Sequence, residues 1–190
     1  MQKSLLIIFT RTPEIGKVKR RLAIKFGDAK ALEIHNKLFA NTLDVANTSN
    51  ISNKIYLSEE PESAMPFNYQ VQLGNDLGER MHNAILNELK HFDKVCLIGS
   101  DCLSLNSSDI ENAFIKLDST DIVIGPAVDG GYYLIGMKKP QPMLFSGIYW
   151  GTSSVLKKTL EKCANEKLLV DQLKLYNDID RPEDVPDNWL

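Results

Sequence analysis

The 190-residue sequence contains only three cysteines, at positions 96, 102 and 163. An odd number without regular spacing excludes a disulfide framework and fits no zinc-binding pattern. We therefore expect reduced thiols and a cytoplasmic protein, because the cytosol keeps thiols reduced. No apolar segment approaches the roughly 20 residues that a membrane span needs. The short apolar run near the N-terminus is better explained as a buried strand.

The chain also lacks a strong excess of charge of either sign. Its formal net charge is −3, with 25% charged and 43% hydrophobic residues. This balance excludes a global attraction to nucleic acid or to an anionic membrane, so a site for an anion has to be built locally. The length fits one domain, and no repeat, low-complexity stretch or linker divides it.

Short apolar runs alternate along the chain with segments of helical periodicity. Strands are expected at residues 4–10, 54–58, 69–73, 94–99, 121–125, 132–137 and 172–177. Helices are expected at residues 28–46, 76–90, 107–117 and 152–163, capped by Asp76, by Ser107 or Ser108, and by Thr152 or Ser153. This alternation predicts a single-domain, three-layer α/β/α fold with a mainly parallel sheet. Ligands of such sheets bind beyond the carboxyl ends of the strands.

A basic loop, residues 10–22, follows the first predicted strand. Five of the 22 basic residues fall within eleven positions there: Arg11, Lys17, Lys19, Arg20 and Arg21. Gly16 lets the backbone approach a ligand closely, and a helix expected from about Val18 would aim its free amides at the same point. In that helix Lys17 and Arg21 share a face. The loop predicts a phosphate or diphosphate site, with a solvated helix end as the alternative. Neither the Walker loop nor the dinucleotide fingerprint is present.

Asp101 follows the predicted strand 94–99 and is a candidate metal ligand. Mg²⁺ and Mn²⁺ prefer hard oxygen ligands, and Mg²⁺ commonly takes one or two carboxylates plus substrate phosphates. Such a metal would neutralise charge on a leaving diphosphate. Asp178 and Asp180, alternating on a predicted strand end, are candidates for a second ligand. The alternative for Asp101 and Asp180 is a role as a helix cap.

Two further turns carry candidate ligand-binding residues. Gly130 and Gly131 suit either a flat ligand or a tight turn, and Asp129 beside them is a candidate for binding a sugar hydroxyl, a metal or an acceptor. Asp76 is a good helix cap, and Arg80 lies four residues further on, where it can reach a phosphate. The three histidines have no partners at metal-ligand spacing and are expected at the surface: His35, His82 and His91.

Six segments together resemble the small glycosyltransferases described as selenodomain- or radical-SAM-associated. That family pattern contains F-x-K-x-P-x-x-G-x-V-K-T-R-L, G-D-L-G-x-R-M, G-S-D-C-P, G-P-A-x-D-G-G-Y-Y, L-F-x-x-I-x-W and D-x-D-x-P-E-D. The matching segments are residues 9–22, 75–81, 99–103, 125–133, 144–150 and 178–184, in the same order. The chain departs from the pattern at four positions: Arg11 for Lys, Arg20 for Thr, Asn75 for Gly and Leu103 for Pro.

The resemblance implies the GT-A fold of nucleotide-diphospho-sugar transferases, with molybdenum-cofactor guanylyltransferases as relatives. It implies that Asp101 binds the metal and that Lys17, Lys19 and Arg21 face the phosphates. The family favours glycosyl transfer from a nucleotide-sugar to a small-molecule acceptor. The single Asp of Ser100-Asp101-Cys102 departs from the Asp-x-Asp of such glycosyltransferases, and the glycine-rich first loop of nucleotidyltransferases is missing too. Nucleotidyl transfer from a nucleoside triphosphate and a non-catalytic nucleotide-sugar-binding module therefore remain alternatives.

Overall fold

The computed structural model describes residues 2–190 and contains one sheet with the order β3-β2-β1-β4-β6-β5-β7. Within it only β6 runs antiparallel to its neighbours β4 and β5, and the other pairs are parallel. The strands are β1 (Ser4–Thr10), β2 (Ser52–Leu57), β3 (Tyr69–Val71), β4 (Lys94–Gly99), β5 (Ile122–Pro126), β6 (Tyr132–Met137) and β7 (Val170–Gln172). The predicted mainly parallel sheet is confirmed.

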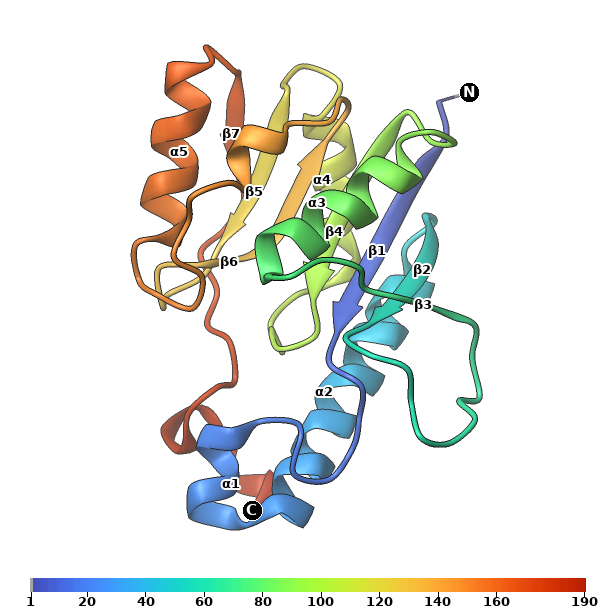
Figure 1. The fold of residues 1–190 in the computed structure, drawn as a ribbon, viewed down its shortest axis with the longest axis vertical. Coiled ribbons are helices and arrows are strands. Elements are labelled where there is room, and N and C mark those ends of the chain that lie inside the picture. The colour runs from blue at the N-terminus through green and yellow to red at the C-terminus, as the bar shows by residue number, and fades with distance from the viewer. Residues whose placement is uncertain (1) are drawn as a thin grey trace.

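Five α-helices cover the two faces of the sheet and the region below it (Figure 1). They are α1 (Arg20–Phe26), α2 (Asp28–Thr48), α3 (Leu77–Glu88), α4 (Ser107–Lys116) and α5 (Val155–Asn165). Short 3-10 helices span Pro142–Leu144, Pro182–Asp184 and Asp187–Trp189. No helix within residues 2–190 is long and apolar enough to cross a membrane.

The alternating side chains of β1 divide the core into two layers. Leu6 and Ile8 pack on one face with side chains of α2 and α4. Leu5 and Ile7 pack on the other face with side chains of α3 and α5. The predicted three-layer α/β/α architecture is therefore confirmed.

A third, smaller apolar cluster lies beyond the carboxyl ends of the parallel strands. It joins α1 and the first half of α2 to the C-terminal segment and contains Leu22, Ala31, Ile34, Leu38, Ile179 and Val185. Figure 1 shows α1 and the C-terminus below the arrowhead of β1. This packing brings residues near 180 close to the basic loop, although more than 150 positions separate them.

Several element boundaries differ from those predicted. Asp76 caps α3 as expected, because its Oδ1 accepts a hydrogen bond of 2.9 Å from the Glu79 amide. The cap of α4 is Asn106, in a reciprocal capping box with Asp109, and α5 follows Ser154. The strand predicted at 172–177 is only partly formed, because regular pairing of β7 with β5 runs from Val170 to Gln172 and continues only as an isolated parallel bridge between Tyr176 and Ala127.

The prediction that all three histidines lie at the surface is wrong for His35, which is only 2% exposed. It lies on the α2 face that also carries the buried Ala31, Ile34 and Leu38, so the helix turns it inward. Its Nε2 lies 3.3 Å from the carbonyl oxygen of Arg11. Burial lowers the pKa of His35. His35 thus supports the start of the basic loop from below.

Candidate active site

Four segments meet beyond the carboxyl edge of the sheet: the basic loop after β1, the end of β4, the turn after β5 and the C-terminal segment. The order of the strands reverses between β1 and β4, which is where ligands bind in open α/β sheets. The Ile179 amide donates to the Asp101 carbonyl at 2.8 Å, and the Val128 amide donates to the Tyr176 carbonyl at 2.9 Å. The C-terminal segment is therefore fixed by its backbone to both sides of this point.

The helix after the basic loop begins at Arg20 rather than near Val18. Lys19 precedes it in the left-handed conformation, with φ 46° and ψ 47°, and Val18 is buried. A left-handed residue interrupts the helical path, so the prediction that Lys17 and Arg21 share a helix face is wrong. Their charged groups lie among different partners.

Lys19 is the buried cation of the site, and its side chain is only 4% exposed. Its Nζ lies 2.8 Å from Asp101 Oδ1 and donates to the Ile179 carbonyl at 2.5 Å. One ammonium group therefore links the basic loop, the end of β4 and the C-terminal segment. A non-glycine residue in this backbone region is uncommon and is typically maintained by surrounding contacts such as these.

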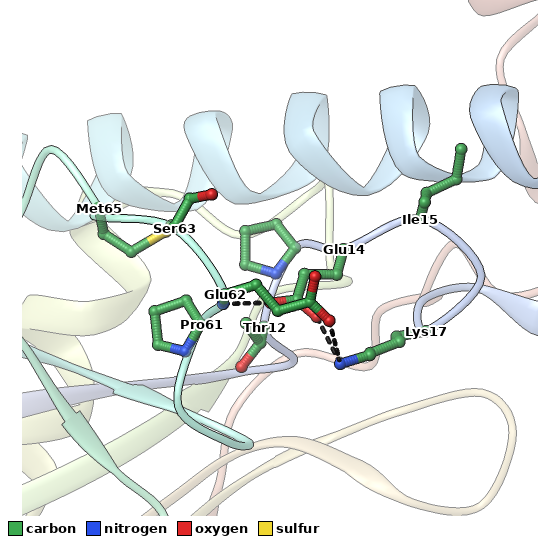
Figure 2. A pocket seen from close by; sticks show the side chains of 9 residues that line it. Thr12, Glu14, Ile15, Lys17, Pro61, Glu62, Ser63 and Met65 are labelled. Atoms are coloured by element: carbon green, nitrogen blue, oxygen red, sulfur yellow. Dashed lines mark hydrogen bonds and ion pairs between the residues drawn. The ribbon is translucent and has the colours of Figure 1, made fainter.

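Lys17 lies among carboxylates at the outer side of the same loop. Its Nζ is 2.5 Å from Glu14, 3.4 Å from Glu59 and 3.5 Å from Glu62. The hydrogen bond with Glu14 is the main cause that raises the pKa of Lys17. Figure 2 shows Lys17, Glu14 and Glu62 in the lining of a cavity between the basic loop and residues 61–65, which has a volume of about 270 Å³. In this structure Lys17 is held by acidic side chains.

The remaining basic residues divide into paired and unpaired ones. Arg21 makes an ion pair with Asp180. Arg80 donates from Nε to the Gly74 carbonyl at 3.0 Å and from Nη1 to the Ser58 carbonyl at 3.3 Å, so it braces the loops after β2 and β3. Within residues 2–190, exposed Arg11 and Arg20 make no ion pair. Their guanidinium groups are the ones available to an incoming anion.

Gly16 lies at a turn of the basic loop. It has a φ of +75°, a conformation that favours glycine, and a side chain there would meet open space. The loop thus presents bare backbone to solvent at Gly16, between Ile15 and Lys17, as a phosphate-binding loop would require.

Asp178 is the carboxylate most perturbed by its surroundings. Burial is the main cause that raises its pKa to about 7, and the negative charges of Asp101 and Asp129 add to the effect. Its Oδ1 is buried and finds no hydrogen-bond partner among residues 2–190. A cation placed between Asp178 and Asp101 would relieve both conditions.

The described residues, 2–190, contain no group of three His, Cys, Asp or Glu side chains arranged to hold a metal ion. Mg²⁺ often takes only one or two carboxylate ligands from the protein when substrate phosphates complete its coordination shell. Asp101 and Asp178 would supply two such carboxylates. Asp180 already pairs with Arg21. The prediction that Asp178 and Asp180 alternate on a strand end is wrong, because that segment is not in a strand.

The Gly pair after β5 forms a tight turn. Asp129 Oδ1 accepts a hydrogen bond of 2.8 Å from the Gly131 amide. Gly130 has a φ of +88°, and a Cβ at this position would lie 2.2 Å from the Ser153 carbonyl oxygen. The turn therefore requires glycine at 130, and it presents the exposed carboxylate of Asp129 beside Asp178.

A second cavity, of about 180 Å³, opens next to these two carboxylates. Its lining includes Trp150 and Met81, to which the sequence analysis assigned no role. Trp150 falls in the segment 144–150 that carried the family resemblance, but its position beside Asp178 depends on long-range packing. Ser100, whose Oγ lies 2.7 Å from Thr10 Oγ1 across β1 and β4, also had no predicted role.

The fold is that of nucleotide-diphospho-sugar transferase-like and cytidylyltransferase-like proteins. Residues 42–152 match the family model described as an uncharacterised protein conserved in bacteria (DUF2064), and the chain belongs to this family. No curated protein matches the chain significantly.

Three solved structures illustrate the class. A protein from Desulfovibrio desulfuricans G20, described provisionally as a nucleotide-diphospho-sugar transferase, is 33% identical with a TM-score of 0.89, over 95% of this chain and 84% of that one. The inositol-1-phosphate CTP transferase from T. maritima is 15% identical with a TM-score of 0.61, over 99% and 94%. The manganese complex of Rv0371C from Mycobacterium tuberculosis H37Rv is 13% identical with a TM-score of 0.59, over 97% and 96%. The last two show similarity of fold.

Proposed function

We propose that this protein is a metal-dependent transferase that takes a nucleotide-sugar as donor and transfers the glycosyl group to a small-molecule acceptor. One observation carries the proposal. At the point where the strand order reverses, the basic loop and the carboxylates Asp101 and Asp178 converge, and Asp178 has a buried oxygen without a partner. This combination suits a diphosphate bridged to carboxylates by a divalent cation.

The divalent cation would be Mg²⁺ or Mn²⁺, held by Asp101 and Asp178, with Asp180 as a further candidate near by. When bound, it would stabilise negative charge on the leaving nucleoside diphosphate. The Rv0371C structure contains manganese, which supports the choice of metal at the level of the fold.

The phosphate grip in this proposal comes from the basic loop and Arg80. Exposed Arg11 and the open backbone at Gly16 are available at once, whereas Lys17 and Arg21 first have to leave their acidic partners. Lys19 instead neutralises Asp101 from the protein side and keeps that carboxylate oriented. Gly130 and Gly131 hold Asp129 where a sugar hydroxyl or the acceptor can reach it.

Nucleotidyl transfer is the second candidate, because the T. maritima structure is that of a CTP transferase. In that reaction an acceptor attacks the α-phosphate and pyrophosphate leaves. A nucleotide-sugar-binding module without turnover is the third candidate. The proposed kinship with selenodomain- or radical-SAM-associated glycosyltransferases, and through them with molybdenum-cofactor guanylyltransferases, favours the first.

Product analysis with Mn²⁺ tests the three candidates. The protein is incubated with a panel of nucleotide-sugars and nucleoside triphosphates together with small hydroxylated acceptors. The proposal predicts release of a nucleoside diphosphate from one nucleotide-sugar. Release of pyrophosphate from a triphosphate would replace glycosyl transfer with nucleotidyl transfer, and Mn²⁺-dependent binding without any product would favour the binding module.

A further inference from the structure

The charge of the second cavity is opposite to that of the basic loop. Its lining contains two carboxylates, Asp129 and Asp178, and no Lys, Arg or His. The mutual repulsion of these carboxylates contributes to the raised pKa of Asp178. A phosphate group in this cavity would be repelled by the negative carboxylates. The lining has no cationic side chain that could offset the cost of desolvating the phosphate.

The rest of the lining is mainly aromatic and aliphatic, and it also carries Tyr132 Oη and Trp150 Nε1, which have no hydrogen-bond partner within residues 2–190. Trp150 meets the ring of Tyr132 edge to face, with centroids 6.4 Å apart and planes at 89°. The indole also packs over Gly78, where an added Cβ would lie 2.5 Å from Trp150 Nε1. Leu77 and Met81 of the α3 region also line the cavity. The cavity thus combines apolar side chains with carboxylate hydrogen-bond acceptors.

The size of the cavity restricts the ligand. Its volume is about 180 Å³. That space suits a ligand no larger than about one sugar ring. A sugar ring has an apolar CH face that suits the apolar side chains of the cavity, and hydroxyl groups at its edge that can donate to the carboxylates.

We propose that this cavity binds the acceptor, and that the acceptor is an uncharged or cationic hydroxylated molecule of monosaccharide size rather than a sugar phosphate. The identification of the ligand as an acceptor rests on the proposed function. The apolar face of the ring packs on Trp150, and its hydroxyls donate to the free oxygens of Asp129 and Asp178. Asp129 lies outside the Asp101–Asp178 metal pair, so its negative charge remains when a metal is bound.

Tryptophan fluorescence can measure this binding at one ring. The chain has two tryptophans, and Trp189 lies in the cluster beyond the sheet, over Lys37. Trp189→Phe keeps an aromatic ring there and leaves Trp150 as the only reporter. In this background the protein is titrated with glucosamine, glucose and glucose 1-phosphate. Glucosamine should bind at least as tightly as glucose. Glucose 1-phosphate should bind at least about tenfold more weakly than glucose, because the carboxylates of the cavity repel its phosphate.

Asp129→Asn tests whether the carboxylate sets this order. The Asn Oδ1 can still accept the hydrogen bond of the Gly131 amide, so the turn is kept while the charge is removed. The ratio of the affinities for glucose and for glucose 1-phosphate should fall by several fold. Glu111→Gln, the same chemical change at a half-buried position of α4 that does not line the cavity, should leave the order of the three affinities unchanged.

Three results would overturn the inference: glucose 1-phosphate binding as tightly as glucose, an unchanged order in Asp129→Asn, or no response of Trp150 to any of the three probes. Binding of nucleoside diphosphates with Mn²⁺ is measured on the same preparation. If nucleotides bind but the three sugars do not show the predicted order of affinity, only the inference about the acceptor is wrong. If the sugar order holds but no nucleotide binds, the cavity remains a sugar site and the proposed function falls.

Discussion

Replacing Lys19 by Met should destabilise the protein, although Lys19 belongs to the basic loop that the sequence predicts to bind phosphate. Met retains most of the length of the side chain and the same left-handed backbone, so the change isolates the ammonium group. That group makes a hydrogen bond of 2.5 Å to the Ile179 carbonyl and an ion pair of 2.8 Å with Asp101.

The magnitude follows from the exposure of the two partners. A hydrogen bond from a charged donor contributes about 1.5–3 kcal/mol. The Asp101 side chain is 44% exposed, so water screens the ion pair, which contributes only about 0.2–1 kcal/mol. Burying the ammonium costs part of this, so we expect a net loss of about 2 kcal/mol. For a chain of this size that corresponds to a melting temperature lower by roughly 4–8 °C.

Urea unfolding followed by circular dichroism measures the loss. Lys25→Met is the matched control, because Lys25 is an exposed residue of α1, the helix that follows Lys19, and a surface change of this kind shifts stability by only about 0.5 kcal/mol or less. If Lys19→Met unfolded at the same urea concentration as Lys25→Met, Lys19 would not link the loop to the C-terminal segment in solution.

Three further predictions concern the turn, the buried carboxylate and the outer loop. Gly130→Ala should cost about 2 kcal/mol or more, because its Cβ would lie 2.2 Å from the Ser153 carbonyl oxygen; Gly147→Ala, also at positive φ but in open space, should cost less, and equal urea midpoints would contradict the packing. With metal ions removed by a chelator, the unfolding free energy of the wild type should fall relative to that of Asp178→Asn as the pH rises from 3.8 to about 7. In that range the native state keeps a proton on Asp178 that the unfolded state has released. Parallel pH profiles of the two proteins would refute the burial of this carboxylate. Lys17→Ala should weaken binding of a nucleoside diphosphate more than that of the nucleoside in calorimetry, and equal losses would mean that Lys17 does not contact phosphate.

Much of the fold follows from local patterns. The strands at 4–10, 94–99 and 132–137 are bounded as predicted, because their apolar runs end at polar or glycine residues. The start of α2 at Asp28 and the cap at Asp76 follow from local chemistry as well. The strand near 172 was misplaced because its register depends on pairing with β5, which the segment itself does not encode.

The site was predictable in its position but not in its pairing. The sequence indicates that Asp101 and the basic loop lie at the carboxyl edge of the sheet. It does not indicate that Lys19 turns inward to Asp101 while Lys17 turns outward to Glu59 and Glu62, because those partners come from distant segments. The position of Trp150 in the cavity was not predictable for the same reason, because its neighbours come from α3 and from the turn after β5.

The most direct test of the account is calorimetric titration of a panel of nucleoside diphosphates into the wild type and Asp101→Ala, each with Mn²⁺ and with chelator. Asp44→Ala, which removes an exposed carboxylate from α2, is the control. One diphosphate should bind the wild type and the control only with Mn²⁺, and Asp101→Ala should lose this metal-dependent binding. Unchanged Mn²⁺-dependent affinity in Asp101→Ala would contradict this prediction.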